Sequence, residues 1–85
     1  MSIIILPLNS KLEQKIKRHR LEKQFNKQLK LLSQNPKHPS LHVELLEPKS
    51  CGIYSLRMNI KFRALFIFRD DKKAIEILNI TVHYK

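Results

Sequence analysis

Alternating apolar residues between positions 61 and 69 constrain the fold of this chain most. In this segment, KFRALFIFR, every second residue is apolar: Phe62, Ala64, Phe66 and Phe68. Successive side chains of a β-strand point to opposite faces of a sheet, so these four residues share one face. We therefore predict a strand over 61–69 with that face buried against the core.

Two further strands are predicted beside it. One spans 53–58 and connects through Asn59 and Ile60. The other spans 74–82 and follows a hairpin turn at 70–73, where two aspartates favour a turn. The alternation predicts that the second face of the three strands is mixed, with a few aliphatic residues beside polar and cationic ones: Arg57, Lys61, Arg63, Asn79, Thr81 and His83. Glu76, the only acid of these strands, has the parity of the buried face, although a single bulge would change part of this assignment.

The N-terminal half predicts helices. We expect residues 2–6 to form a short buried strand bounded by Pro7, and Asn9 and Ser10 are good N-cap residues. Apolar residues at helical spacing predict helices over about 10–19 and 21–34. The stripe changes phase near His19, which favours a break there, although one helix over 10–34 is the alternative. After the proline-rich segment 35–40, a short edge strand is expected within 41–46 and a turn at 48–52.

Charge and length limit the possible functions. The 85 residues suffice for one domain, residues 1–85, and 17 Lys and Arg against 7 Asp and Glu give a formal net charge of +10. Such a charge is typical of proteins that bind nucleic acid or another polyanion. The single cysteine excludes an internal disulfide, and the chain has neither a CxxC motif nor a His and Cys pair with metal-ligand spacing. The only early apolar run is too short for a signal peptide or a membrane span, so we expect a cytoplasmic protein with no membrane partner. We also expect no metal and no cofactor.

The cationic sheet face has two interpretations. Lys and Arg on alternate strand positions often mark a solvated face or protect an edge. A solvated face would carry charges of both signs, however, and guanidinium groups are suited to bidentate contacts with phosphate. We therefore favour a face that binds a phosphate backbone.

The chain resembles the RelE/ParE superfamily of toxins from type II toxin–antitoxin systems. The likeness rests on the basic helical pair KLEQKIKRHRLEKQFNKQLKLL, the segment NPKHPSLHVELLEP, the strand pair GIYSLRMNIKFRALFIF and the closing ITVHYK. It implies an α+β fold in which two N-terminal helices pack on one face of a twisted antiparallel sheet. It also implies an antitoxin partner with an acidic segment that wraps the toxin.

The resemblance further implies site residues. RelE- and YoeB-like members cleave mRNA in the ribosomal A site, and Arg57 and Arg63 lie where such members hold the scissile phosphate. His83 would transfer a proton, because imidazole titrates near neutral pH, and Tyr84 would assist it. Lys61 and Arg69 are the expected RNA-binding residues.

Three functions remain open at the level of sequence. The first is a metal-independent mRNA endoribonuclease, and the second is a ParE-like gyrase inhibitor without catalysis. The third is an inactive relative that binds RNA or a partner protein. YoeB-like enzymes also use a glutamate before the strand pair, for which Glu44 and Glu47 are the candidates.

Overall fold

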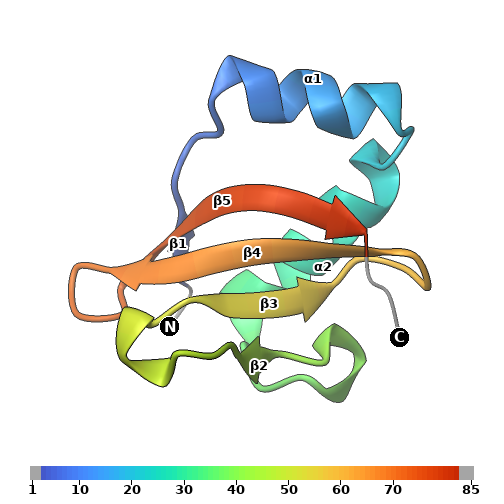
Figure 1. The fold of residues 1–85 in the computed structure, drawn as a ribbon. Coiled ribbons are helices and arrows are strands. Elements are labelled where there is room, and N and C mark those ends of the chain that lie inside the picture. Colours follow the sequence, from blue (N-terminus) through green and yellow to red (C-terminus); the bar gives the residue numbers. More distant parts are fainter. Residues whose placement is uncertain (1–2, 83–85) are drawn as a thin grey trace.

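The computed structural model describes residues 3–82, which form two α-helices and a five-stranded sheet (Figure 1). The helices are α1 (Ser10–Arg18) and α2 (Glu22–Gln34). The strands are β1 (Ile4–Ile5), β2 (Glu44–Leu45), β3 (Tyr54–Arg57), β4 (Phe62–Arg69) and β5 (Ala74–Val82). Two short 3-10 helices, η1 (Pro39–Leu41) and η2 (Lys49–Cys51), flank β2.

The sheet has the strand order β1-β5-β4-β3-β2. The three long predicted strands are adjacent and antiparallel, and the predicted hairpin at 70–73 joins β4 to β5. β1 pairs with the start of β5 in parallel, which makes the sheet mixed rather than wholly antiparallel. β1 is also less buried than expected, because Ile4 is 65% exposed at the edge of the sheet.

The two helices are separate, as the change of phase predicted. Asn9 caps α1 by accepting a hydrogen bond from the Leu12 amide at 2.8 Å. At the other end Arg20 has a φ of 56°, and the Leu21 and Arg20 amides donate to the carbonyls of Ile16 and Lys17. This pattern is a Schellman motif with arginine where glycine is usual, and it turns the chain into α2.

Both helices pack into one hydrophobic core with the inner face of the sheet. α2 lies behind the sheet, whereas α1 lies along the outer edge of β5 (Figure 1). The core includes Leu12 and Ile16 of α1 and Phe25 and Leu32 of α2. Three of the predicted inner residues of β4 also belong to it, and the fourth, Phe68, is partly buried against it. Lys15 of α1 donates hydrogen bonds to the Ile80 carbonyl at 2.6 Å and to Asn79 Oδ1 at 3.1 Å. Lys15 thereby supplies a hydrogen-bond donor to a backbone carbonyl on the outer edge of β5. Neither helix of the described residues is long and apolar enough to span a bilayer.

A bulge in β5 corrects one prediction. Leu65 pairs with Asn79, but the next residue, Phe66, pairs with Ile77, so β5 holds one extra residue, Leu78. The parity of β5 therefore reverses before this point. Ile77 is buried rather than on the polar face, and Glu76 lies opposite Ile67 rather than on the buried face.

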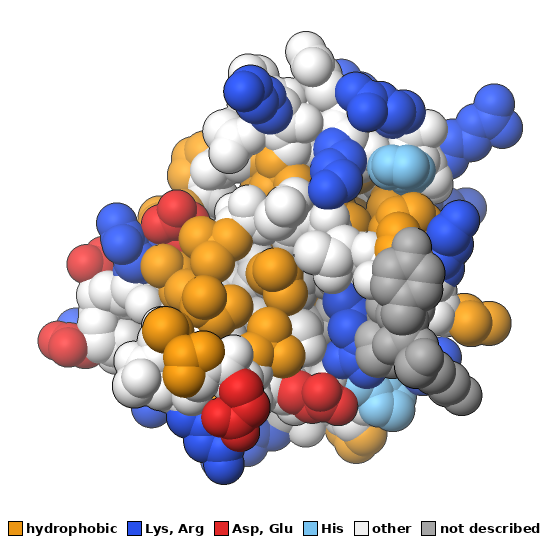
Figure 2. Space-filling model, in the orientation of Figure 1, with side chains coloured by type: hydrophobic (Ala, Val, Ile, Leu, Met, Phe, Trp, Pro, Cys, Tyr) orange, Lys and Arg blue, Asp and Glu red, His pale blue; other side chains and the backbone are white. Residues whose placement is uncertain are grey.

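The sheet face that points away from α2, here called the open face, is divided into two parts. Figure 2 shows apolar side chains gathered on the half of this face nearest the β4–β5 hairpin. By register these are half-buried residues on or beside the strands: Leu46, Ile53, Leu65, Ile67 and Leu78. The cationic strand residues Arg57 and Arg63 occupy the other half, so the expected platform exists but covers only part of the sheet.

Candidate functional site

The site is built around two arginines that are cross-strand neighbours on the adjacent strands β3 and β4. Arg57 ends β3 and Arg63 is the second residue of β4, and the two are direct partners in the antiparallel register. Both therefore project from the open face, as the period of two predicted. Like charges directly opposite one another destabilise a sheet, so this pair is unfavourable without a ligand.

Arg63 is held by its neighbours. Its side chain is only 16% exposed, and its Nη1 donates to Ser55 Oγ at 3.2 Å and lies 3.9 Å from Glu44 Oε2. Its Nε is buried and has no hydrogen-bond partner among the described residues. A buried guanidinium nitrogen without a hydrogen-bond partner is costly, and a catalytic or binding role is one explanation for such a group in a native structure.

Arg57 has a different environment. Its Nη1 lies 3.4 Å from Nε2 of His42, which follows η1 in a left-handed conformation with a φ of 47°. Its backbone carbonyl accepts a 2.6 Å hydrogen bond from Nε2 of Gln28, a buried residue of α2. The strand end that carries Arg57 is therefore fixed to α2, while its guanidinium group is half-buried beside an exposed imidazole.

The remaining predicted residues are not all brought to this place. Lys61 lies in the bend before β4, exposed, with its Nζ 5.5 Å from the centre of the Phe62 ring. Arg69 lies at the far end of β4, where its Nε is 3.5 Å from Glu76 Oε1. β5 ends at Val82, so the predictions for His83 and Tyr84 lie outside the described residues.

The structure distinguishes the two candidate glutamates. Glu44 of β2 pairs with Ser55, which lies on the open face, and its carboxylate approaches Arg63. Glu47 lies in the bend after β2. Glu44 is therefore the carboxylate beside the arginine pair. His42 was missed by sequence reasoning, because its position depends on the turn that η1 makes.

The assembled groups can bind and polarise a phosphate. Two guanidinium groups on opposed strand positions offer hydrogen-bond donors, Glu44 offers an exposed carboxylate, and His42 offers an imidazole that can give or take a proton. Within residues 3–82, no group of three or more His, Cys, Asp and Glu side chains could hold a metal ion.

Comparisons with known proteins identify the fold. No model of a known protein family matches the sequence, and a search of curated proteins found no significant match. Solved structures with similar folds cover nearly the whole chain. A YoeB/ParE toxin from Agrobacterium tumefaciens is 16% identical with a TM-score of 0.72, and the match covers 99% of this chain and 100% of that one.

Two further structures agree with this result. RelE in an archaeal RelE–RelB complex from Pyrococcus horikoshii is 17% identical with a TM-score of 0.75, over 96% of each chain. A chain of the YoeB–YefM toxin–antitoxin complex from Staphylococcus aureus is 23% identical with a TM-score of 0.68, over 99% of this chain and 98% of that one. The chain therefore has the RelE-like fold that the sequence resemblance predicted.

Proposed function

We propose, starting from this RelE-like fold, that the chain is the toxin of a toxin–antitoxin pair and cleaves mRNA in the ribosomal A site. Residues 1–85 would act as one toxin domain in the cytoplasm. The observation that carries the proposal is the opposed pair Arg57 and Arg63 on the open face. A fold tolerates two guanidinium groups in direct opposition more easily when an anion joins them, and a scissile phosphate is such an anion.

The proposed chemistry is in-line attack by a ribose 2′-hydroxyl on the adjacent phosphate. The 2′-oxygen forms a bond to phosphorus, the bond from phosphorus to the 5′-oxygen breaks, and the product is a cyclic phosphate. Negative charge increases on the phosphate as the reaction proceeds, so fixed guanidinium groups stabilise the transition state more than the ground state. Ser55 and Glu44 would keep Arg63 in position for this role.

Two proton transfers complete the reaction. The 2′-hydroxyl must lose a proton, and the Glu44 carboxylate beside Arg63 is the group that would accept it. The leaving 5′-oxygen must gain a proton, and an imidazole is suited to donate it. His42 beside Arg57 is one candidate donor, and His83, from the resemblance, is the other.

The test is induced expression of the wild type and of Arg63→Gln, followed by mapping of mRNA 5′ ends. We expect growth arrest with new cuts at the A-site codon, and the loss of both in Arg63→Gln. Loss of one transition-state contact of this kind reduces rate by about 10²–10³. Glu44→Gln should reduce cleavage in the same assay, whereas Glu47→Gln is the matched control and should cleave like the wild type.

The outcomes separate the alternative functions. Growth arrest with damaged DNA and intact mRNA would contradict this proposal and support gyrase inhibition instead. No arrest by the wild type would leave only a binding role. Comparison of His42→Gln with His83→Gln then identifies the proton donor, because only its replacement should remove one limb of the pH–rate profile.

The proposed partner is an antitoxin with an acidic segment. The surrounding charge supports this partner, because 17 basic residues against 7 acidic ones attract a polyanionic chain. An acidic antitoxin segment would compete with RNA for the arginine pair and so prevent cleavage.

A further inference from the structure

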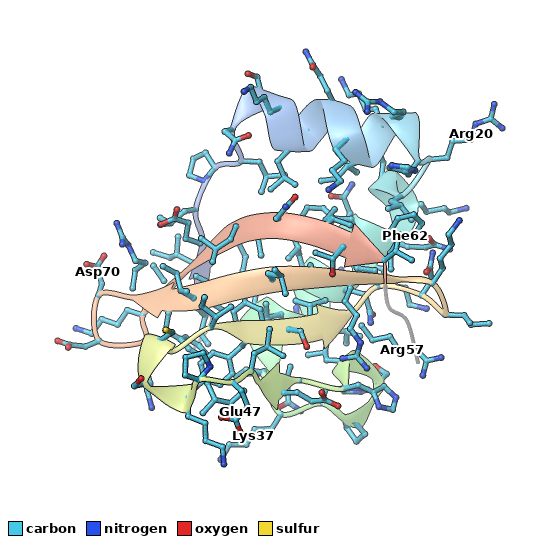
Figure 3. The ribbon with its side chains drawn as sticks, viewed as in Figure 1. Arg20, Lys37, Glu47, Arg57, Phe62 and Asp70 are labelled. Atoms are coloured by element: carbon cyan, nitrogen blue, oxygen red, sulfur yellow. The ribbon has the colours of Figure 1, made fainter. Side chains whose placement is uncertain are left out.

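We infer that single-stranded RNA leaves the arginine pair along a groove made by two neighbouring hollows, which bind nucleotides flanking the cleaved bond. The groove runs between α2, η1 and the β3–β4 connection. Figure 3 shows Arg57, Phe62 and Arg20 along one end of the molecule, opposite the hairpin of Asp70. The inference rests on the proposed RNase function and extends it to the substrate beyond the reacting phosphate.

The first hollow begins at Arg57, one member of the arginine pair. It has a volume of about 420 Å³, and Arg57, His42, Lys27 and Gln24 are among the residues that line it. This volume lies within the range of small-ligand sites. Lys27 is exposed on α2, where its ammonium group can meet a phosphate, and the imidazole of His42 offers a face on which a base can stack.

The second hollow continues from the first. It has a volume of about 430 Å³ and repeats the same chemistry, with Arg20 and Lys61 as cations and His19 as the imidazole. The His19 ring is already packed against Phe62, with ring centroids 5.0 Å apart. An aromatic platform is therefore present beside the cations.

One pair of amides joins the two hollows. Gln24 and Asn59 line both, and Asn59 Nδ2 donates to Gln24 Oε1 at 3.0 Å. Asn59 Oδ1 in turn accepts from the backbone amides of Lys61 and Phe62, each at 2.8 Å, which fixes its side chain. The Gln24 amide nitrogen makes no hydrogen bond within the described part of the chain. It is therefore a donor that can read a base edge where the strand crosses from one hollow to the next.

The lining favours RNA over an acidic peptide. The described residues that line the two hollows include four cations, two histidines and no acid. A peptide would need only the cations. The repeated combination of cation, imidazole and amide instead matches the phosphate, base face and base edge of a nucleotide.

The experiment measures binding without cleavage. The purified protein carries Arg63→Gln in every sample, and fluorescence anisotropy measures its affinity for single-stranded di- and hexaribonucleotides at several salt concentrations. We expect tighter binding of the hexanucleotide. Adding Arg20→Gln and Lys27→Gln should weaken hexanucleotide binding and lower its salt slope by about 1.4, because each phosphate contact on a single strand contributes about 0.7. Dinucleotide affinity should not change.

The matched control adds Arg18→Gln and Lys30→Gln, which remove the same charge from exposed positions of α1 and α2 outside the hollows. Equal losses in the two double variants would overturn the inference, as would equal affinity for the short and long oligonucleotides. A groove variant that loses only the binding of an acidic antitoxin peptide would overturn it too. Because the assay needs no toxicity, absence of growth arrest by the wild type would count against the RNase proposal alone.

Discussion

At the scale of single residues, the site combines groups that weaken the fold. Arg57 and Arg63 are directly opposed in the sheet. The Glu44 carboxylate offsets the positive charge of Arg63 alone, with Oε2 at 3.9 Å from Arg63 Nη1. Arg63 also has a buried Nε without a partner among the described residues. Evolution tolerates such local costs mainly at functional sites. Stability and activity should therefore respond in opposite directions when the pair is removed.

We predict that Arg57→Thr raises the free energy of unfolding by about 0.5 kcal/mol at low salt, because it ends the like-charge pair and places a β-branched residue in a strand. The proposed mRNA cleavage should be lost in the same variant. The gain should shrink at high salt, which screens the repulsion that the substitution removes. Urea unfolding at two salt concentrations measures it.

Arg69→Thr is the control for this prediction. It removes an arginine from the same sheet, but one that lies beside an acid, Glu76, at 3.5 Å. Its unfolding free energy should stay level or fall. A loss of stability in Arg57→Thr at low salt would contradict the view that the arginine pair strains the sheet.

Sequence reasoning found the arginine pair but not its surroundings. The period of two placed Arg57 and Arg63 on one face without any knowledge of tertiary structure. It could not find His42, whose contact with Arg57 depends on η1 and on a left-handed backbone conformation at His42 itself. Nor could it choose between Glu44 and Glu47, because that choice depends on the pairing of a two-residue strand with β3.

At the scale of elements, α1 does more than cover the core. β1 pairs only with the start of β5. The rest of this outer edge of β5 has no neighbouring strand among the described residues, and α1 lies along it (Figure 1). Lys15 reaches that edge and donates to the Ile80 carbonyl and to Asn79. Open strand edges favour pairing with other chains, so this contact protects the fold as well as stabilising it.

We predict that Lys15→Met lowers the free energy of unfolding by about 1 kcal/mol, because the backbone acceptor of Ile80 loses a charged donor while the apolar stem is retained. Chemical denaturation followed by circular dichroism measures the change. Lys17→Met, an exposed position of the same helix, is the control and should change stability little. Equal effects in the two variants would contradict a specific role for Lys15.

The sequence predicted the elements better than their connections. The phase shift near His19 correctly indicated two helices, because a continuous helix would have rotated its apolar stripe away from the core. The parallel pairing of β1 was not predictable from a short apolar run, whose partner depends on the path of the chain. The bulge did leave a signal: Ile77 and Leu78 are adjacent apolar residues in the segment 75–82, which otherwise alternates.

At the scale of the whole molecule, positive charge extends well beyond the arginine pair. The outer surfaces of both helices carry lysines and arginines, and the formal net charge is +10. A field of this extent accelerates the approach of any polyanion, whereas the local contacts decide how long it stays bound.

We predict that the association rate constant with the proposed acidic antitoxin falls steeply as salt is added, while the dissociation rate constant changes less. The reason is the Debye length, which falls from about 10 Å at 0.1 M salt to about 3 Å at 1 M. Stopped-flow fluorescence with the purified pair gives both constants. An association rate that does not depend on salt would show that the net charge has no part in recognising the partner.

The extra residue in β5 makes the length of this strand as important as its composition. It is the reason that Ile75 and Ile77 enter the core while Glu76 reaches the open face. Removing one residue from the strand would expose two isoleucines and push a carboxylate into the apolar interior. Natural variants of this chain should therefore keep a constant number of residues between 74 and 82, even where the residues themselves differ, and changes of length should be confined to the turn before it.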